Sequence, residues 1–134
     1  MKYMIALSVY HNRNHTSIPC LLSDKRKPLE EHAEKVKANA YKLLDQFMAG
    51  TIKLGEIQLM AWRSRDKADA MRNLYPNRLM GCSYETICLE YLHYRCGCKE
   101  EFEANMLRHG SDYTFKEDFD CDFPTYSLEM IELI

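Results

Sequence analysis

The sequence predicts a single α+β domain, dominated by helices, in which a small sheet packs on a long central helix. Two patterns lead to this prediction. Apolar residues recur at steps of four and three through residues 28–48, which is the period of one helix face. Residues 3–10 instead alternate between the two sides of an extended chain. A length of 134 residues and a hydrophobic fraction of 46% suit one domain with its own core.

The first predicted element is a well-buried strand over residues 3–10. Its alternating apolar positions are Ile5, Leu7 and Val9. A polar, turn-rich stretch follows over residues 11–17, and residues 18–22 are expected to extend again. Pro19 lacks the N–H that an inner strand must donate, so this second segment is expected at the edge of the sheet.

The central helix is predicted over residues 28–48. Its apolar stripe consists of Leu29, Ala33, Val36, Ala40, Leu43 and Phe47. Pro28 suits the first helical position, because the N–H that proline lacks has no intrahelical acceptor there. Gly50 lies where a left-handed C-terminal cap is expected. We interpret this helix as scaffold.

Residues 51–62 fit either a strand or a helix, and the glycines that precede and interrupt them favour a strand. Ser64 is then expected to cap a helix that ends before Pro76. Another helix is predicted from Ser83 to a break at Gly97.

A further helix is predicted over residues 99–109, with Phe102 and Met106 pointing inward. For residues 125–134 the pattern allows either a closing strand or a short helix.

Composition excludes two classes of protein. The chain has no apolar run near the ~20 residues that a membrane span needs, and its N-terminus lacks the cleavage site of a signal peptide. We therefore expect a cytoplasmic protein, whose six cysteines serve as thiols or metal ligands rather than as a disulfide framework.

The net charge of −2 conceals an uneven distribution. Residues 1–78 hold fourteen Lys/Arg and eight Asp/Glu, whereas residues 79–134 hold four and twelve. Such a split predicts either that the two halves attract each other or that each half faces a partner of opposite sign. Two solvated surfaces without partners are the simpler alternative.

An acidic and aromatic segment in the second half is the leading candidate for a binding surface. Its members are Asp112, Tyr113, Phe115, Glu117, Asp118, Phe119, Asp120, Asp122 and Phe123. Carboxylates around apolar anchors suit a basic groove, because the rings supply buried area while the charges steer the encounter. An edge strand with alternate residues buried is the structural alternative.

We therefore predict a small protein-interaction module, an inhibitor or adaptor, that binds a partner with a basic surface. Short phage- or virus-encoded effectors that bind host proteins often have this kind of sequence. No catalytic set is evident, so an enzyme is the less favoured class.

The second hypothesis is a phosphoesterase or nuclease-like enzyme. Residues 15–18 read His-x-Ser followed by an apolar residue, and residues 109–111 repeat His-x-Ser before an aspartate. These tripeptides resemble the motifs of two-histidine phosphoesterases, in which each histidine handles a proton and each hydroxyl a phosphate oxygen. The catalytic residues on this hypothesis are His11, His15, Ser17 and His109. Histidines in a polar turn and at a helix end are the non-catalytic alternative.

The third hypothesis is a zinc-stabilised module. Its candidate ligands are Cys82, Cys88, His93, Cys96 and Cys98. Zinc takes about four N or S ligands in a tetrahedron, and His93 and Cys96 are one helical turn apart. Against this, Cys88 lies on the apolar stripe, where a free cysteine usually acts as a small hydrophobic side chain. No zinc or other cofactor is therefore the favoured prediction.

Basic side chains of the first half raise the question of nucleic acid. They are Lys25, Arg26, Lys27, Arg63, Arg65, Lys67 and Arg72, with Trp62 as a ring on which a base can stack. No nucleic-acid motif accompanies them, so a solvated face is favoured over a nucleic-acid partner.

Overall fold

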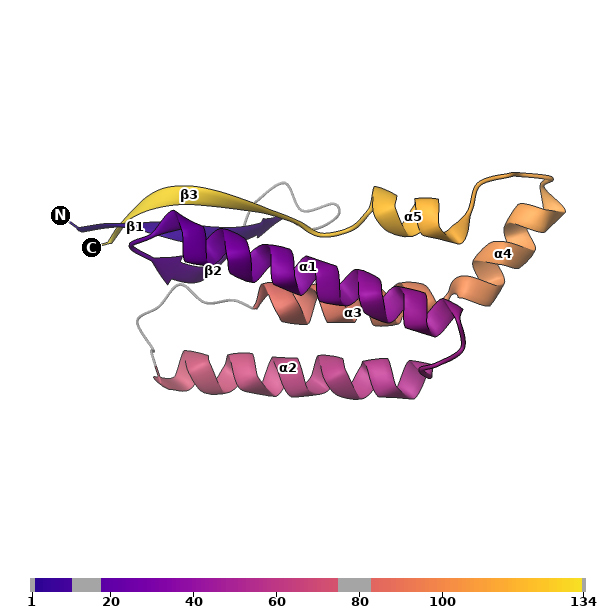
Figure 1. Cartoon of the computed structure of the whole chain (residues 1–134), viewed down its shortest axis with the longest axis horizontal. Helices are drawn as coiled ribbons and strands as arrows, with labels where there is room; N and C mark the ends of the chain where they lie inside the picture. Colours follow the sequence, from indigo (N-terminus) through magenta and orange to yellow (C-terminus); the bar gives the residue numbers. More distant parts are fainter. Residues whose placement is uncertain (1, 11–17, 75–82, 134) are drawn as a thin grey trace.

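The computed structural model describes residues 2–10, 18–74 and 83–133 (Figure 1). Its elements are β1 (Lys2–Tyr10), β2 (Ile18–Ser23), α1 (Arg26–Met48), α2 (Leu54–Leu74), α3 (Tyr84–Gly97), α4 (Lys99–Arg108), α5 (Phe115–Cys121) and β3 (Thr125–Leu133). The predicted helix-dominated α+β fold, with a small sheet packed on a long helix, is confirmed.

The sheet has the strand order β2-β1-β3, and β1 pairs antiparallel with both neighbours. Residues 6–9 of β1 are each at most 1% exposed, so the predicted buried strand is confirmed. β2 is an edge strand, as the position of Pro19 predicted. For residues 125–134 the sequence allowed either a strand or a helix, and this segment forms the strand β3. Pairing of β3 with β1 brings the two ends of the chain side by side (Figure 1).

α1 buries the predicted stripe. Its buried residues are Leu29, Ala33, Val36, Ala40, Leu43 and Leu44. Pro28 is the third helical residue, within the first turn, where N–H groups have no intrahelical acceptor. Gly50 has a φ of +79°, and the Thr51 N–H donates to the Gln46 carbonyl across 2.9 Å. The predicted left-handed cap is therefore confirmed.

The prediction of a strand over residues 51–62 is wrong, because α2 runs without a break from Leu54 to Leu74. Ser64 caps no helix: it is 6% exposed inside α2, and its hydroxyl lies 2.7 Å from the Thr86 hydroxyl of α3. Ile57, Ala61 and Ser64 recur at helical spacing on this face. Leu59, which completed the apparent alternation, is 47% exposed.

The C-terminal acidic segment is also helical. α5 begins after Thr114, whose side chain accepts a hydrogen bond from the Glu117 N–H as an N-cap. The rings of Phe115 and Phe119 are one helical turn apart and therefore point to the same side, which is buried. Phe119 packs 5.4 Å from the Tyr41 ring of α1, measured between ring centroids.

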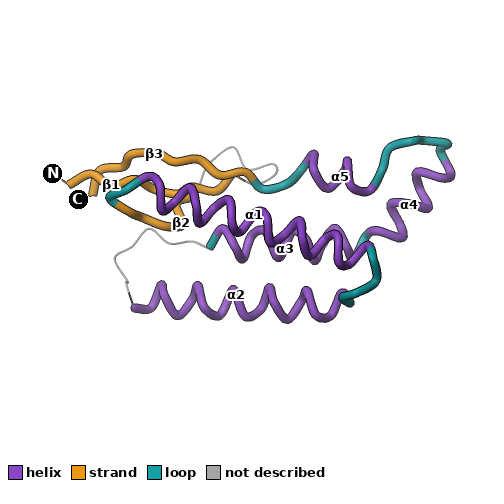
Figure 2. Tube along the Cα trace, in the orientation of Figure 1, coloured by secondary structure: helices purple, strands orange, loops and turns teal. Residues whose placement is uncertain are grey.

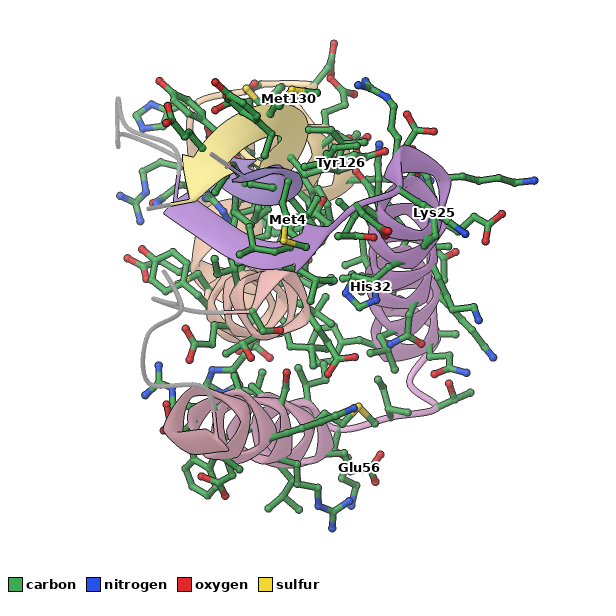
Figure 3. The ribbon with its side chains drawn as sticks, turned by 90° about the vertical axis from the view of Figure 1, so that its left-hand side faces the viewer. Met4, Lys25, His32, Glu56, Tyr126 and Met130 are labelled. Carbon is green, nitrogen blue, oxygen red and sulfur yellow. The ribbon has the colours of Figure 1, made fainter. Side chains whose placement is uncertain are left out.

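The helices are arranged around α3, which contacts both α1 and α2. The strands gather at one end of the molecule (Figure 2), and α1 contacts all three of them. α4 lies at the opposite end, attached to α3 and α5. Seen along the molecule, α2 lies apart from the sheet, on the far side of α3 (Figure 3). Among the described helices, none combines the length and the apolar character needed to cross a membrane.

Candidate functional site

The rings of the predicted binding segment face the interior. Phe115, Phe119 and Phe123 are 6%, 0% and 8% exposed. Phe119 lies 5.0 Å from the Tyr91 ring of α3, centroid to centroid, in addition to its contact with α1. The expectation that these three rings are offered to a partner is therefore wrong. Four-residue spacing turns Phe115 and Phe119 to one side of α5, and Phe123, just past the end of that helix, packs against Phe119 with ring centroids 5.5 Å apart.

Three carboxylates of the same segment have partners within the molecule. Arg95 of α3 donates from Nη1 to Asp118 and from Nη2 to Asp122, across 2.9 and 2.5 Å. The Tyr41 hydroxyl donates to Asp120 across 2.7 Å. Asp118 and Asp122 therefore hold α5 against α3, and the expectation that they face a partner is corrected.

The Arg95 guanidinium sits in a polar and aromatic setting. Its side chain is 20% exposed, and its Cζ atom lies 5.4 Å from the centroid of the Tyr91 ring. A cation over an aromatic face is stabilised by the ring quadrupole. Burial raises the pKa of Tyr91 to about 12, so this ring carries a neutral hydroxyl at physiological pH. Arg95 thus joins the C-terminal end of α3 to two carboxylates of the following segment and to the Tyr91 ring.

Four members of the predicted segment are exposed, which are Asp112, Tyr113, Glu117 and Asp120. Of these, Asp120 also accepts the hydrogen bond from Tyr41. Tyr113 is 38% exposed and packs one ring edge on Phe102 of α4. Binding of a partner at these residues stays a prediction.

α4 extends this acidic surface beyond the segment that the sequence pattern indicated. None of its residues is buried. Leu107 is 84% exposed, the largest exposed fraction among the exposed large hydrophobic side chains of the described residues. Its carboxylates Glu100, Glu101 and Glu103 are exposed, and Glu103 forms an ion pair with Lys99 on the same helix. One feature of the sequence does indicate an exposed apolar residue here. Leu107 follows Met106, the last residue of the predicted inward stripe, and so falls outside that stripe.

We refer to residues 99–122 as the acidic arm. The arm holds eight Asp/Glu and three Lys/Arg, a net charge of −5. Its α4 forms the end of the molecule opposite the strands, and α5 leads from there back toward β3 (Figure 1). Phe102, which packs on Phe115 with ring centroids 6.1 Å apart, joins α4 to the buried side of α5. The arm therefore has one anchored side and one exposed, acidic side.

The histidine hypothesis falls mostly outside the described residues. His11, His15 and Ser17 are not among them. His109 is exposed and ends α4, far from the strands (Figure 1). Phosphoesterase chemistry at these residues stays a prediction.

The cysteine hypothesis gains no support from the described ligands. Burial raises the pKa values of Cys88 and Cys96 to about 12, whereas zinc binds the thiolate form. Cys98 and His93 are half-buried, and Cys82 lies outside the described residues. Within residues 2–10, 18–74 and 83–133, no three His, Cys, Asp or Glu side chains gather in a way that suits a metal ion.

The basic side chains are distributed over two helices and partly neutralised. Arg26 and Lys27 form ion pairs with acidic residues one turn further along α1. Arg65 of α2 pairs with Glu90 of α3. Trp62 is 55% exposed on α2. Lys25 lies at the strand end of α1, away from α2 (Figure 3), so it does not form one continuous patch with the described basic side chains of α2.

No family model, curated protein or solved structure matches this chain.

Proposed function

We propose that the protein is a small interaction module, of the inhibitor or adaptor type, that docks on a partner with a basic surface through its acidic arm. The observation that carries the proposal is the solvent exposure of α4. This helix buries none of its residues, yet it presents Leu107 with 84% of its surface exposed beside a row of carboxylates.

Helical spacing places these groups together. Glu100, Glu103 and Leu107 are three and four residues apart and share one face of α4. On this face an apolar side chain is bordered by acidic groups. A helix of this kind fits a groove whose apolar socket is rimmed by Lys or Arg. The leucine supplies the buried contact, and the carboxylates set orientation and association rate.

The energetics of α4 support the same proposal. A helix of ten residues is marginal by itself, because nucleation costs more than a few hydrogen bonds return. Its inward contacts include the ring of Phe102 against Tyr113 and Phe115, and the Lys99 ammonium over the Phe115 ring. The described part of the chain leaves Leu107 exposed. A partner that covers the outer face of α4 buries this side chain and so stabilises the helix.

Asp118, Asp122 and the three phenylalanines make contacts within the molecule, so the proposed binding surface does not include them. These side chains hold α5 against α3 and α1. Contacts with the partner are assigned to the outer face of α4 and to the exposed Asp112, Tyr113 and Glu117.

The test is affinity capture from host-cell extract with three versions of the protein. One is the wild type, and one carries Glu100→Gln, Glu103→Gln and Leu107→Ser. The third is a control on α2, Glu56→Gln with Leu59→Ser, which changes an exposed glutamate and an exposed leucine three residues apart on another helix.

The proposal expects a basic protein that the wild type and the α2 control retain at low salt, that the arm variant loses, and that salt releases. Equal capture of the same proteins by all three versions, or loss only with the α2 variant, overturns it.

A further inference from the structure

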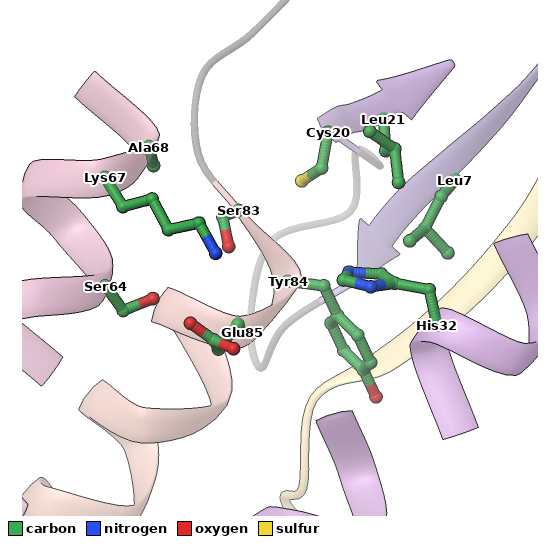
Figure 4. Close-up of a pocket in the computed structure, with 10 residues that line it drawn as sticks. All are labelled: Leu7, Cys20, Leu21, His32, Ser64, Lys67, Ala68, Ser83, Tyr84 and Glu85. Carbon is green, nitrogen blue, oxygen red and sulfur yellow. The ribbon is translucent and has the colours of Figure 1, made fainter. Parts of the chain in front are cut away.

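A pocket opens where α1, α2, the start of α3 and the sheet meet. Its volume is about 160 Å³. Its apolar walls come from Leu7, Leu21, Ala68 and the ring of Tyr84 (Figure 4). It lies at the strand end of the molecule, away from the acidic arm, and none of the three function hypotheses uses it.

We infer that this pocket binds a small, uncharged, single-ring aromatic molecule that carries one hydroxyl group, a phenol. The inference rests on three features, which are the size of the cavity, the chemistry of its walls and the balance of charge at its rim.

The size fits one ring. An apolar cavity of about 150 Å³ in another protein takes up benzene, so a cavity of about 160 Å³ accommodates a six-membered ring with a small substituent. The space exists because the inward face of α2 becomes small toward its C-terminal half. Ile57 is followed on that face by Ala61, Ser64 and Ala68, and none of these three reaches the opposite wall.

The walls favour an apolar ring over water. Leu7 is fully buried and Tyr84 is 1% exposed, so both present fixed apolar surface. The Tyr84 hydroxyl points away from the pocket and donates to the Pro124 carbonyl across 2.9 Å. Ser64 already has a hydrogen-bond partner in Thr86. The Ser83 hydroxyl, which also lines the pocket, accepts a hydrogen bond from the Thr86 N–H across 3.3 Å. The hydroxyl groups of Tyr84, Ser64 and Ser83 are therefore already engaged within the protein.

The rim carries charges of both signs. Lys67 of α2, Glu85 of α3 and His32 of α1 line the pocket (Figure 4), and Lys67 and His32 are exposed to solvent. None of the three forms an ion pair with the part of the chain that the structure describes. One lysine and one glutamate nearly cancel, so the rim does not select a charged ligand. A hydroxyl group can donate to Glu85 and accept from Lys67, which is why a phenol fits better than plain benzene.

The experiment titrates the full chain with phenol and follows the His32 ring and Ala68 methyl signals by NMR. For a ligand of this size we expect a dissociation constant on the order of 1 mM. Ala68→Leu fills the cavity and is expected to weaken binding by about tenfold or more. Ala70→Leu adds the same side chain at an exposed position of α2 and is expected to leave binding unchanged.

Benzoate and anilinium are the charged probes, and both are expected to bind more weakly than phenol. If Ala68→Leu fails to fold, as judged by circular dichroism, Leu21→Trp blocks the pocket from the β2 wall instead. The inference is overturned if phenol causes no shift at about 10 mM, a concentration well above the expected constant. It is also overturned if the blocked variant binds phenol as well as the wild type, or if a charged probe binds best.

Discussion

Arg95 of α3 and Asp118 of α5 are joined by a hydrogen-bonded ion pair in which Nη1 lies 2.9 Å from Oδ2. Both side chains are 20% exposed, so the pair is largely withdrawn from solvent. The second nitrogen of the same guanidinium reaches Asp122. This arrangement fixes α5 with its phenylalanines inward, and it decides which carboxylates of the C-terminal segment are left for a partner.

Removal of the cation is expected to loosen α5. Arg95→Ala leaves Asp118 and Asp122 without their partner and removes the contact with the Tyr91 ring. We expect a loss of about 2 kcal/mol in the free energy of unfolding, measured by urea denaturation. Arg65→Ala, which breaks an ion pair with 60% and 40% exposed side chains, is the control and is expected to cost about 0.5 kcal/mol. Equal costs for the two variants would show that Arg95 does not hold α5.

A comparison of Phe119 with Tyr113 distinguishes a core residue from a candidate binding residue. Phe119→Ala is expected to lower the free energy of unfolding by about 4 kcal/mol, because the ring is fully buried between Tyr41 and Tyr91. Tyr113→Ala is expected to cost less than about 1 kcal/mol, since this ring is 38% exposed. Thermal or urea unfolding of both variants makes the comparison. A Phe119 variant as stable as the wild type would restore the interpretation of this ring as a docking residue.

The hydroxyl of Tyr84 ties α3 to the start of β3. It donates to the Pro124 carbonyl at a buried site. Tyr84→Phe leaves that carbonyl without its donor and is expected to cost about 1.5 kcal/mol. Tyr126→Phe removes an exposed hydrogen bond to Glu34 and serves as the control, with an expected cost of about 0.5 kcal/mol or less. The prediction fails if the control costs as much as the buried change.

The buried thiols predict a loss of stability in alkali. Burial raises the pKa values of Cys88 and Cys96 to about 12, above the ordinary value of 9.0. Because the folded state holds these protons more tightly, their contribution is complete below about pH 9 and is lost as the pH rises toward 12. The free energy of unfolding is therefore expected to fall between pH 9 and 11, and to fall less steeply in Cys88→Ala with Cys96→Ala.

Alkylation at pH 8.5, followed by peptide mass spectrometry, gives an independent readout of the same thiols. The exposed Cys121 is expected to react well before Cys88 and Cys96. Rapid modification of the two buried thiols in the folded protein would contradict the raised pKa values.

The parts of the fold that sequence predicted are those in which local pattern and tertiary contact agree. The stripe from Leu29 to Leu43 is buried as its spacing indicates, and β1 is buried as its alternation indicates. α2 was missed because Ile57, Leu59 and Ala61 match a strand as well as a helix. The deciding fact, that Leu59 is exposed while Ser64 meets Thr86, is a contact between distant parts of the chain.

The candidate site also combines features that local sequence predicts with contacts that it does not predict. The four-residue steps between Phe115, Phe119 and Phe123 fit a helix, but the aspartates between them suggested an alternating surface. That the acids serve Arg95 cannot be read from local sequence, because the residues are 23 and 27 positions apart. α4 was predicted as a helix, yet the exposure of Leu107 depends on where α3 and α5 place it.

The most direct test of the proposed acidic arm is hydrogen–deuterium exchange of the full chain, with and without the basic protein identified by capture. The account predicts slower exchange at the amides of residues 99–109 in the complex, with little change in α2 and the sheet. Protection confined to α2 or to the strands, with α4 exchanging as fast as in the free protein, would contradict it.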